Sequence, residues 1–222
     1  MNAPVARTLL TRLSFGLAAG VISFALTTVQ GVLRDGYDSW HQAISALALG
    51  PGGWLQMLNL TVFGAVLLTT VSPWRRILSG GIGAVAYPAL TALVGVSFMV
   101  LGLVRQDPAP GYDPEGLAHT VPTAAGLVHL AIAGVAAFSS VASLFVMASR
   151  FAANANTDTA WPRWALYSRA TALVVVVCVV VYGVWSVESS GYAGTFERMA
   201  MLAPMVWMFA LLRRLYRGVP IM

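Results

Sequence analysis

The sequence predicts an all-α membrane protein, a bundle of six transmembrane helices that forms a single domain over residues 1–222. Three observations support this fold class: 58% of the residues are apolar, only 9% are charged, and the apolar residues occur in long runs. Soluble domains carry roughly 25% charged residues. A water-soluble fold therefore lacks the polar surface it would need here, and the same composition excludes a disordered chain.

About 20 apolar residues are needed to cross a hydrocarbon core of about 30 Å. Runs of this kind predict membrane spans over residues 13–33, 55–74, 77–104, 121–149, 168–188 and 198–217. The last span has a short charge-free stretch, but the Arg side chains at its two ends can extend to opposite interfaces. The first run lacks a small-residue cleavage site and exceeds the apolar core of a typical signal peptide, so we expect a retained helix.

Six spans place both termini on one side, and the basic residues indicate which side it is. All 13 basic residues are Arg, and only Arg34, Arg105 and Arg198 fall on the side opposite the termini. The other ten are Arg7, Arg12, Arg75, Arg76, Arg150, Arg163, Arg169, Arg213, Arg214 and Arg217. The positive-inside rule then predicts cytoplasmic termini.

The absence of Lys beside abundant Ala, Val, Gly and Arg is typical of a bacterial protein, for which the membrane would be the inner membrane. Basic residues placed singly or in pairs between apolar runs form no phosphate-binding stripe, so no nucleic-acid partner is expected. Membrane lipids and a lipid-like small molecule are the expected partners.

The residues that could carry chemistry gather in the outer loops. Seven of the eight acidic residues lie there, and the exception is Asp158. In the first outer loop Ser39 and Gln42 form a capping-box pattern, and Gly50 followed by Pro51 is a stop signal, which together predict a short helix over residues 40–49. Its apolar stripe would be Trp40, Ile44 and Leu47, with Asp38, His41 and Ser45 on a polar side. A serine nucleophile is disfavoured, because triad roles normally come from separate elements.

In the second outer loop, Asp113, Pro114 and Glu115 form a standard helix start, and Glu115 can pair with His119 four residues later. His129 follows inside a charge-free run, at membrane depth, where an ionisable residue is a functional candidate. The alternative is a neutral histidine that hydrogen-bonds across helices. We expect Asp38, His41 and His129 to line one outward-facing cavity, with Glu188 or His119 at its rim.

No metal and no cofactor are expected. On a straight helix His119 and His129 would lie about 15 Å apart, too far for one ion. The lone Cys178 excludes a cysteine cluster. Gln30 and Asn59 are expected to join helices by hydrogen bonds. If the protein is a structural subunit, the run Gly80, Gly81 and Gly83 would serve close helix packing. Residues 72–76 are expected to form a tight turn.

A short pattern recurs in the three outer loops: Gly36-Tyr37-Asp38, Gly111-Tyr112-Asp113 and Gly191-Tyr192-Ala193. The recurrence is consistent with three helical hairpins related by duplication. The alternative is that Gly and Tyr simply suit turns and membrane interfaces.

One stretch of the chain carries a family resemblance: Gly36-Tyr37-Asp38, Ile44-Ser45-Ala46-Leu47, and Gly50-Pro51-Gly52-Gly53-Trp54-Leu55-Gln56 with Asn59. It resembles the bacterial family called domain of unknown function 998. The Asp107 loop, the His129 region and residues 164–171 are similar to later parts of that family. The resemblance implies a six-span bacterial inner-membrane protein and no established reaction.

Three classes of function remain. The first is an intramembrane enzyme that acts on a lipid or isoprenoid substrate by acid–base chemistry, with Asp38, His41, His119, His129 and Glu188 as candidate catalytic residues. The second is a structural or accessory subunit that binds partner helices. The third is a small proton-coupled transporter, which would need polar residues in both leaflets.

Overall fold

The computed structural model describes residues 3–108, 111–116, 121–186 and 191–218, and confirms the all-helical fold class. The helices are α1 (Ala3–Leu33), the short 3-10 helix η1 (Ile44–Ala48), α2 (Gly53–Thr69), α3 (Val71–Ile77), α4 (Ala86–Leu103), α5 (Ala124–Ala153), α6 (Trp161–Trp185) and α7 (Ala193–Tyr216). Within the described residues, six stretches are long and apolar enough to cross a membrane, with α2 and α3 together forming one of them.

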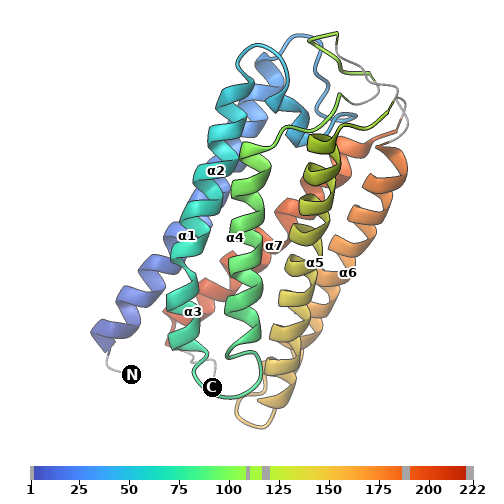
Figure 1. The fold of residues 1–222 in the computed structure, drawn as a ribbon. Helices are drawn as coiled ribbons and strands as arrows, with labels where there is room; N and C mark the ends of the chain where they lie inside the picture. The colour runs from blue at the N-terminus through green and yellow to red at the C-terminus, as the bar shows by residue number, and fades with distance from the viewer. Residues whose placement is uncertain (1–2, 109–110, 117–120, 187–190, 219–222) are drawn as a thin grey trace.

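The six spans form a closed ring rather than a filled bundle. Each span packs against its neighbours in the chain, and α7 returns to pack against α1. Figure 1 shows α7 crossing obliquely behind the other helices, from beside α6 at one end to beside α1 at the other. Both termini lie at the same end, called here the terminal end; the opposite end is the loop end. This arrangement leaves a hollow centre that every span lines.

Glycines bring α2 and α4 into close contact. A Cβ atom on Gly64 would lie 2.4 Å from the carbonyl oxygen of Gly95, and one on Gly102 would lie 2.5 Å from that of Met57. No side chain fits at such distances, so these glycines let the two backbones touch. The close packing predicted for Gly80, Gly81 and Gly83 is wrong: they form a loop with positive φ angles of 79°, 74° and 82°.

The turn expected at residues 72–76 is also displaced, because those residues continue the span as α3. Pro73 is tolerated there because a proline in the first turn of a helix costs no hydrogen bond. The chain reverses over residues 78–85 instead. Arg150 of α5 holds that loop by donating to the carbonyls of Gly80 at 2.9 Å and Ile82 at 2.8 Å.

Aromatic side chains close the terminal end of the ring. Phe151 stacks on Trp161 with ring centroids 5.0 Å apart, and both are buried. The Trp207 indole N–H donates to the Ser168 hydroxyl at 2.9 Å. The Arg214 guanidinium lies 4.4 Å from the centre of the Trp161 ring. A packed aromatic core therefore occupies this end of the ring.

The first outer loop folds back into the loop end of the ring, as predicted, but its helix is shorter than residues 40–49. Only Ile44–Ala48 is helical, and it is a 3-10 helix. Asp38 rather than Ser39 organises the start: its carboxylate accepts the Trp40 N–H at 2.8 Å, and the Gln42 side chain accepts the Asp38 N–H. These bonds make a turn, which leaves Trp40 66% exposed and separates it from the buried Ile44 and Leu47.

Residues 43–49 are all buried, and we call this segment the plug. Gly50 ends it with a φ of 69°, as the predicted stop signal requires. A Cβ atom on Gly53 would lie 2.2 Å from the Ala48 carbonyl oxygen, so only glycine allows α2 to begin this close to the plug.

Candidate functional site

Three ionisable side chains hold the plug and the turn that precedes it. Arg34, at the end of α1, donates to the Leu49 carbonyl at 2.8 Å. Glu197 of α7 accepts the Ile44 N–H at 2.5 Å. Arg198 donates to the Tyr37 hydroxyl at 2.7 Å and to the Gln42 carbonyl at 3.2 Å. The plug is therefore tied to the first and last spans of the ring.

The second outer loop packs over the plug from the other side. The Gln42 amide donates to the Gly111 carbonyl at 3.1 Å, and Ser45 donates to the Gln106 side chain. The Tyr37 and Tyr112 rings meet edge to face at 5.3 Å, and both are buried. Two tyrosines of the recurring pattern thus support the plug directly; a duplication of hairpins stays a prediction.

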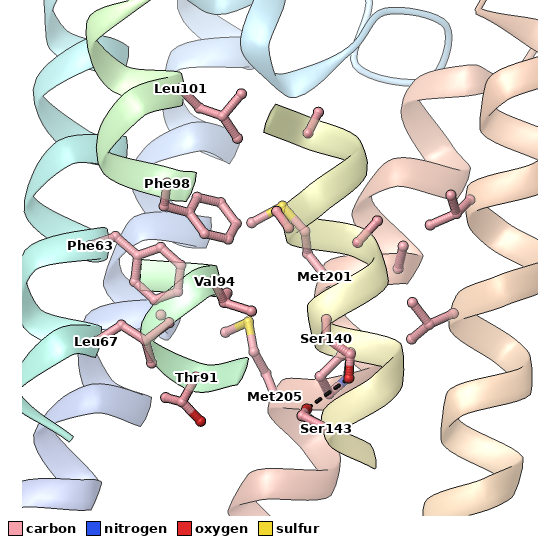
Figure 2. Close-up of a pocket in the computed structure, with 18 of the residues that line it drawn as sticks. Phe63, Leu67, Thr91, Val94, Phe98, Leu101, Ser140, Ser143, Met201 and Met205 are labelled. Atoms are coloured by element: carbon pink, nitrogen blue, oxygen red, sulfur yellow. Dashed lines mark hydrogen bonds between the residues drawn. The ribbon is translucent and has the colours of Figure 1, made fainter. Parts of the chain in front are cut away.

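Beneath the plug lies an elongated cavity of about 430 Å³ inside the ring. Its walls include His129 near one end of α5 and Leu144 further along, which are about 22 Å apart at the helical rise. Most lining side chains are apolar. Figure 2 shows Phe63 and Phe98 on one side of the cavity, facing Met201 and Met205 of α7.

The acidic and imidazole groups of this cavity are confined to its loop end. Tyr182, His129 and Glu197 all line it, together with Ile44 and Ser45 of the plug. Tyr182, His129 and Glu197 lie within about 8 Å of the loop ends of their helices, at about 1.5 Å per residue. Three different spans therefore place polar groups at one level, directly below the plug.

Hydroxyl groups deeper in the cavity are satisfied by their own helices. Thr91 donates to the Tyr87 carbonyl at 2.9 Å, Ser143 to the Ser140 carbonyl at 2.7 Å, and Thr70 to the Leu67 carbonyl at 2.6 Å. Ser140 and Ser143 are joined by a dashed line in Figure 2. Each of these hydroxyls has thus already donated its one proton within its own helix, so the deep part of the cavity is less polar than its residue types alone would indicate.

His129 is fixed in one orientation by a single hydrogen bond. Its Nδ1 lies 2.6 Å from the carbonyl oxygen of Val104, at the end of α4. A carbonyl can only accept, so Nδ1 carries the proton and Nε2 of the neutral ring is an acceptor. This bond joins α4 to α5, as the helix-joining interpretation of His129 requires, while the ring still borders the cavity.

Asp38 and His41 pair with each other outside the cavity. Asp38 Oδ2 lies 2.7 Å from His41 Nδ1, and the His41 ring stacks on Tyr192 with centroids 4.8 Å apart. The Trp40 N–H, followed by His41, lowers the pKa of Asp38 below its usual value. Neither Asp38 nor His41 lines the cavity that His129 lines, so the expected common cavity for all three is not formed.

The physical reason for this separation is the plug itself. Its turn at residues 38–42 holds Asp38 and His41 on the surface of the loop end, whereas η1 carries Ile44 and Ser45 inward. His119 and Glu188, the two expected rim residues, lie outside the described residues.

The predicted helix start at Asp113 is wrong. Helix α5 begins at Ala124, and Thr123 caps it by accepting the Gly126 N–H at 3.0 Å. Asp107 in turn accepts the Thr123 N–H at 2.9 Å. Glu115 instead forms an ion pair with Arg105 and accepts the Gly50 N–H at 2.7 Å, and the Arg105 bond lowers its pKa.

Gln30 and Asn59 join helices, as predicted. The Gln56 side-chain oxygen on α2 accepts from the Gln30 amide at 2.9 Å, across the contact with α1. Asn59 donates to the Ser23 carbonyl at 3.1 Å and to the Thr27 hydroxyl at 3.2 Å. In the part of the chain that the structure describes, no three His, Cys, Asp or Glu side chains gather in a metal-binding arrangement.

Two residues that line the polar end of the cavity, Glu197 and Tyr182, were not among the predicted site residues. A sequence signal for Glu197 exists, because it lies five residues after Tyr192 of the recurring pattern, much as His41 lies four residues after Tyr37. Tyr182 lies one turn before the end of its span and points to the same level.

The family model described as protein of unknown function, DUF998, matches residues 17–214. No curated protein and no solved structure matches the chain significantly.

Proposed function

Because this chain belongs to the DUF998 family, whose function is unknown, we propose a function from the cavity itself. The protein binds a single lipid or isoprenoid molecule inside the ring of helices. The apolar chain of the ligand occupies the deep part of the cavity, and its polar head lies at Tyr182, His129 and Glu197.

The observation that carries this proposal is the shape and polarity of the cavity. Its volume of about 430 Å³ lies within the range typical of small-molecule sites. The cavity extends about 22 Å along α5, which is long enough for an extended hydrocarbon chain. It is shorter than the bilayer core of about 30 Å, so such a chain would fit within the membrane-spanning part of the protein. Polar groups at one end and apolar walls elsewhere match an amphipathic molecule with one head and one tail.

Cavity filling tests the proposal. Ala137 lines the cavity on α5, whereas Val135 on the same helix is 40% exposed and does not line it. We expect Ala137→Phe to lose the lipid that copurifies with the wild-type protein in mild detergent, as detected by native mass spectrometry. Val135→Phe adds an aromatic ring to the same helix and should retain the lipid. Equal lipid occupancy in both variants would contradict the proposal.

A second candidate function is acid–base catalysis on that lipid, the enzyme hypothesis in a relocated form. It is favoured by the unprotonated Nε2 of His129 and the carboxyl group of Glu197, which border the head-group end together. The candidate catalytic residues at this position are therefore His129 and Glu197 in place of Asp38 and His41. His129→Gln and Glu197→Gln should then stop conversion of lipids from a bacterial total extract, while both variants still bind lipid.

Two other classes give different results in these experiments. A proton-coupled transporter would move a solute across vesicles in response to a pH gradient, and Glu197→Gln would abolish that movement. A structural subunit would keep its partner when the cavity is filled, so Ala137→Phe would leave copurifying proteins unchanged.

The same proposal places the protein in a bacterial inner membrane with cytoplasmic termini. Its support is the distribution of Arg, since ten of the 13 basic residues lie at the terminal end. The plug and the head-group end of the cavity would then face outward.

A further inference from the structure

We infer that the head group held below the plug is an uncharged hydroxyl, so that the ligand is a long-chain alcohol rather than a phosphate ester. The inference rests on the proposed lipid-binding function and names the chemical class of its ligand. It follows from which charges border the cavity, which hydrogen-bonding groups remain for a ligand, and where the nearby arginines are engaged.

No cation borders the head-group end within the described lining residues. The chain has no Lys, and the three Arg residues of the loop end are engaged elsewhere. Arg198 donates to the Tyr37 hydroxyl and to two backbone carbonyls, Arg105 pairs with Glu115, and Arg34 binds the Leu49 carbonyl. Arg198 acts electrostatically on Glu197 from the next position of α7, but it does not line the cavity. A phosphate head would therefore lie beside the Glu197 carboxyl group with no cation in contact with it, which is unfavourable in an apolar cavity.

A hydroxyl matches the groups that border the cavity. It donates one hydrogen bond, for which His129 Nε2 and Glu197 are acceptors. It also accepts, and the Tyr182 hydroxyl is the lining donor at the same level, within electrostatic range of Glu197. The Ser45 hydroxyl already donates to the Gln106 side chain, so it joins the plug to the second outer loop and does not donate to a ligand.

Geometry also limits the size of the head. The plug lies directly over this end of the cavity, with Ile44 held by Glu197 at 2.5 Å and with Ala46 and Leu47 fully buried above it. A hydroxyl fits beneath the plug without displacing it. A bulky sugar or glycerophosphate head would require residues 43–49 to leave the ring.

The test compares three ligands that share one chain: geranylgeraniol, geranylgeranyl phosphate and geranylgeranylamine. Each is titrated into the delipidated protein in nanodiscs, and binding is measured by native mass spectrometry. We expect geranylgeraniol to bind about tenfold or more tightly than the phosphate, since an unpaired charge costs more than a neutral hydrogen bond.

Glu197→Gln keeps an oxygen for the Ile44 N–H but removes the ionisable carboxyl group. We expect it to raise phosphate affinity about tenfold relative to the wild-type protein. Asp35→Asn is the matched control, because Asp35 is an exposed acid at the same end that does not line the cavity. It should leave all three affinities unchanged.

The outcomes separate the two proposals. Phosphate binding as tight as alcohol binding overturns the head-group inference and leaves lipid binding intact. Tightest binding of the amine overturns the hydroxyl in favour of a cationic head paired with Glu197. If none of the three ligands binds, and Ala137→Phe also changes nothing, the proposed function itself is wrong.

Discussion

The carboxylate of Glu197 accepts the backbone N–H of Ile44 at 2.5 Å, across 153 positions of sequence. Glu197 belongs to α7 and Ile44 to the plug, and both border the cavity. One side chain therefore closes the loop end of the ring and forms part of the wall below it. This relationship couples the position of the plug to whatever occupies the cavity, since a ligand head must share the carboxyl group with the plug.

Replacement of Arg198 by Lys should destabilise the plug. The guanidinium donates three hydrogen bonds, to Tyr37, Gln42 and Gly194, in a fork that a single ammonium cannot reproduce. We expect a loss of about 2 kcal/mol in the free energy of unfolding, as for hydrogen bonds to charged groups. Unfolding of the detergent-solubilised protein by SDS measures it. Arg213→Lys, at an exposed position of the same helix, should change nothing.

Replacement of Gly64 by Ala should separate α2 from α4. The new methyl group would lie 2.4 Å from the Gly95 carbonyl oxygen, so the helices must move apart at a cost of about 1–3 kcal/mol. Gly134→Ala is the control, since its Cβ atom meets nothing within 4 Å. It should be neutral or slightly stabilising in a thermal unfolding assay. Equal melting temperatures for the two variants would show that the α2–α4 contact is not close.

Acid should destabilise the loop end. The folded protein holds the pKa of Glu115 low through Arg105 and Gly50, and that of Asp38 low mainly through the Trp40 N–H. Both charged forms stabilise the fold, so their contribution is complete above the usual carboxyl pKa of about 4 and is lost as the pH falls through the folded values.

Thermal midpoints of the detergent-solubilised protein, measured between about pH 7 and about pH 3, should fall on the acidic side. Glu115→Gln should melt earlier at neutral pH and show a flatter dependence on pH. A midpoint that rises on acidification would mean that these carboxylates do not stabilise the folded loops.

Cysteine labelling should report the orientation of the chain. In a Cys178→Ala background, Asp35→Cys places a thiol at an exposed position of the loop end, and Asn156→Cys places one at an exposed position of the terminal end. We expect a membrane-impermeant maleimide to label position 35 in intact cells and position 156 only after lysis. The opposite result would reverse the proposed topology.

The spans were predictable from the sequence because each depends on a local property, the length of an uninterrupted apolar run. Gly53–Ile77 extends the predicted 55–74 by a few residues at each end, and Ala193–Tyr216 begins five residues before the predicted 198–217 and ends one residue before it. The end of the plug was predictable for the same reason, since Gly50 can adopt a positive φ of 69° at no steric cost. The length of the plug helix was harder to predict, because both Asp38 and Ser39 could cap the turn that precedes it and the structure uses Asp38.

By itself the sequence determined that the chain has six apolar spans, that both termini share one end, and that acids gather at the other end. It also singled out His129, because an ionisable residue in a charge-free run needs a partner. Only the tertiary structure decided that His129 shares a cavity with Glu197 rather than with Asp38. Glu197 and His129 are 68 positions apart, and their meeting depends on how α7 crosses the ring. That crossing is set by side-chain packing between spans, which the hydropathy of each single span does not encode.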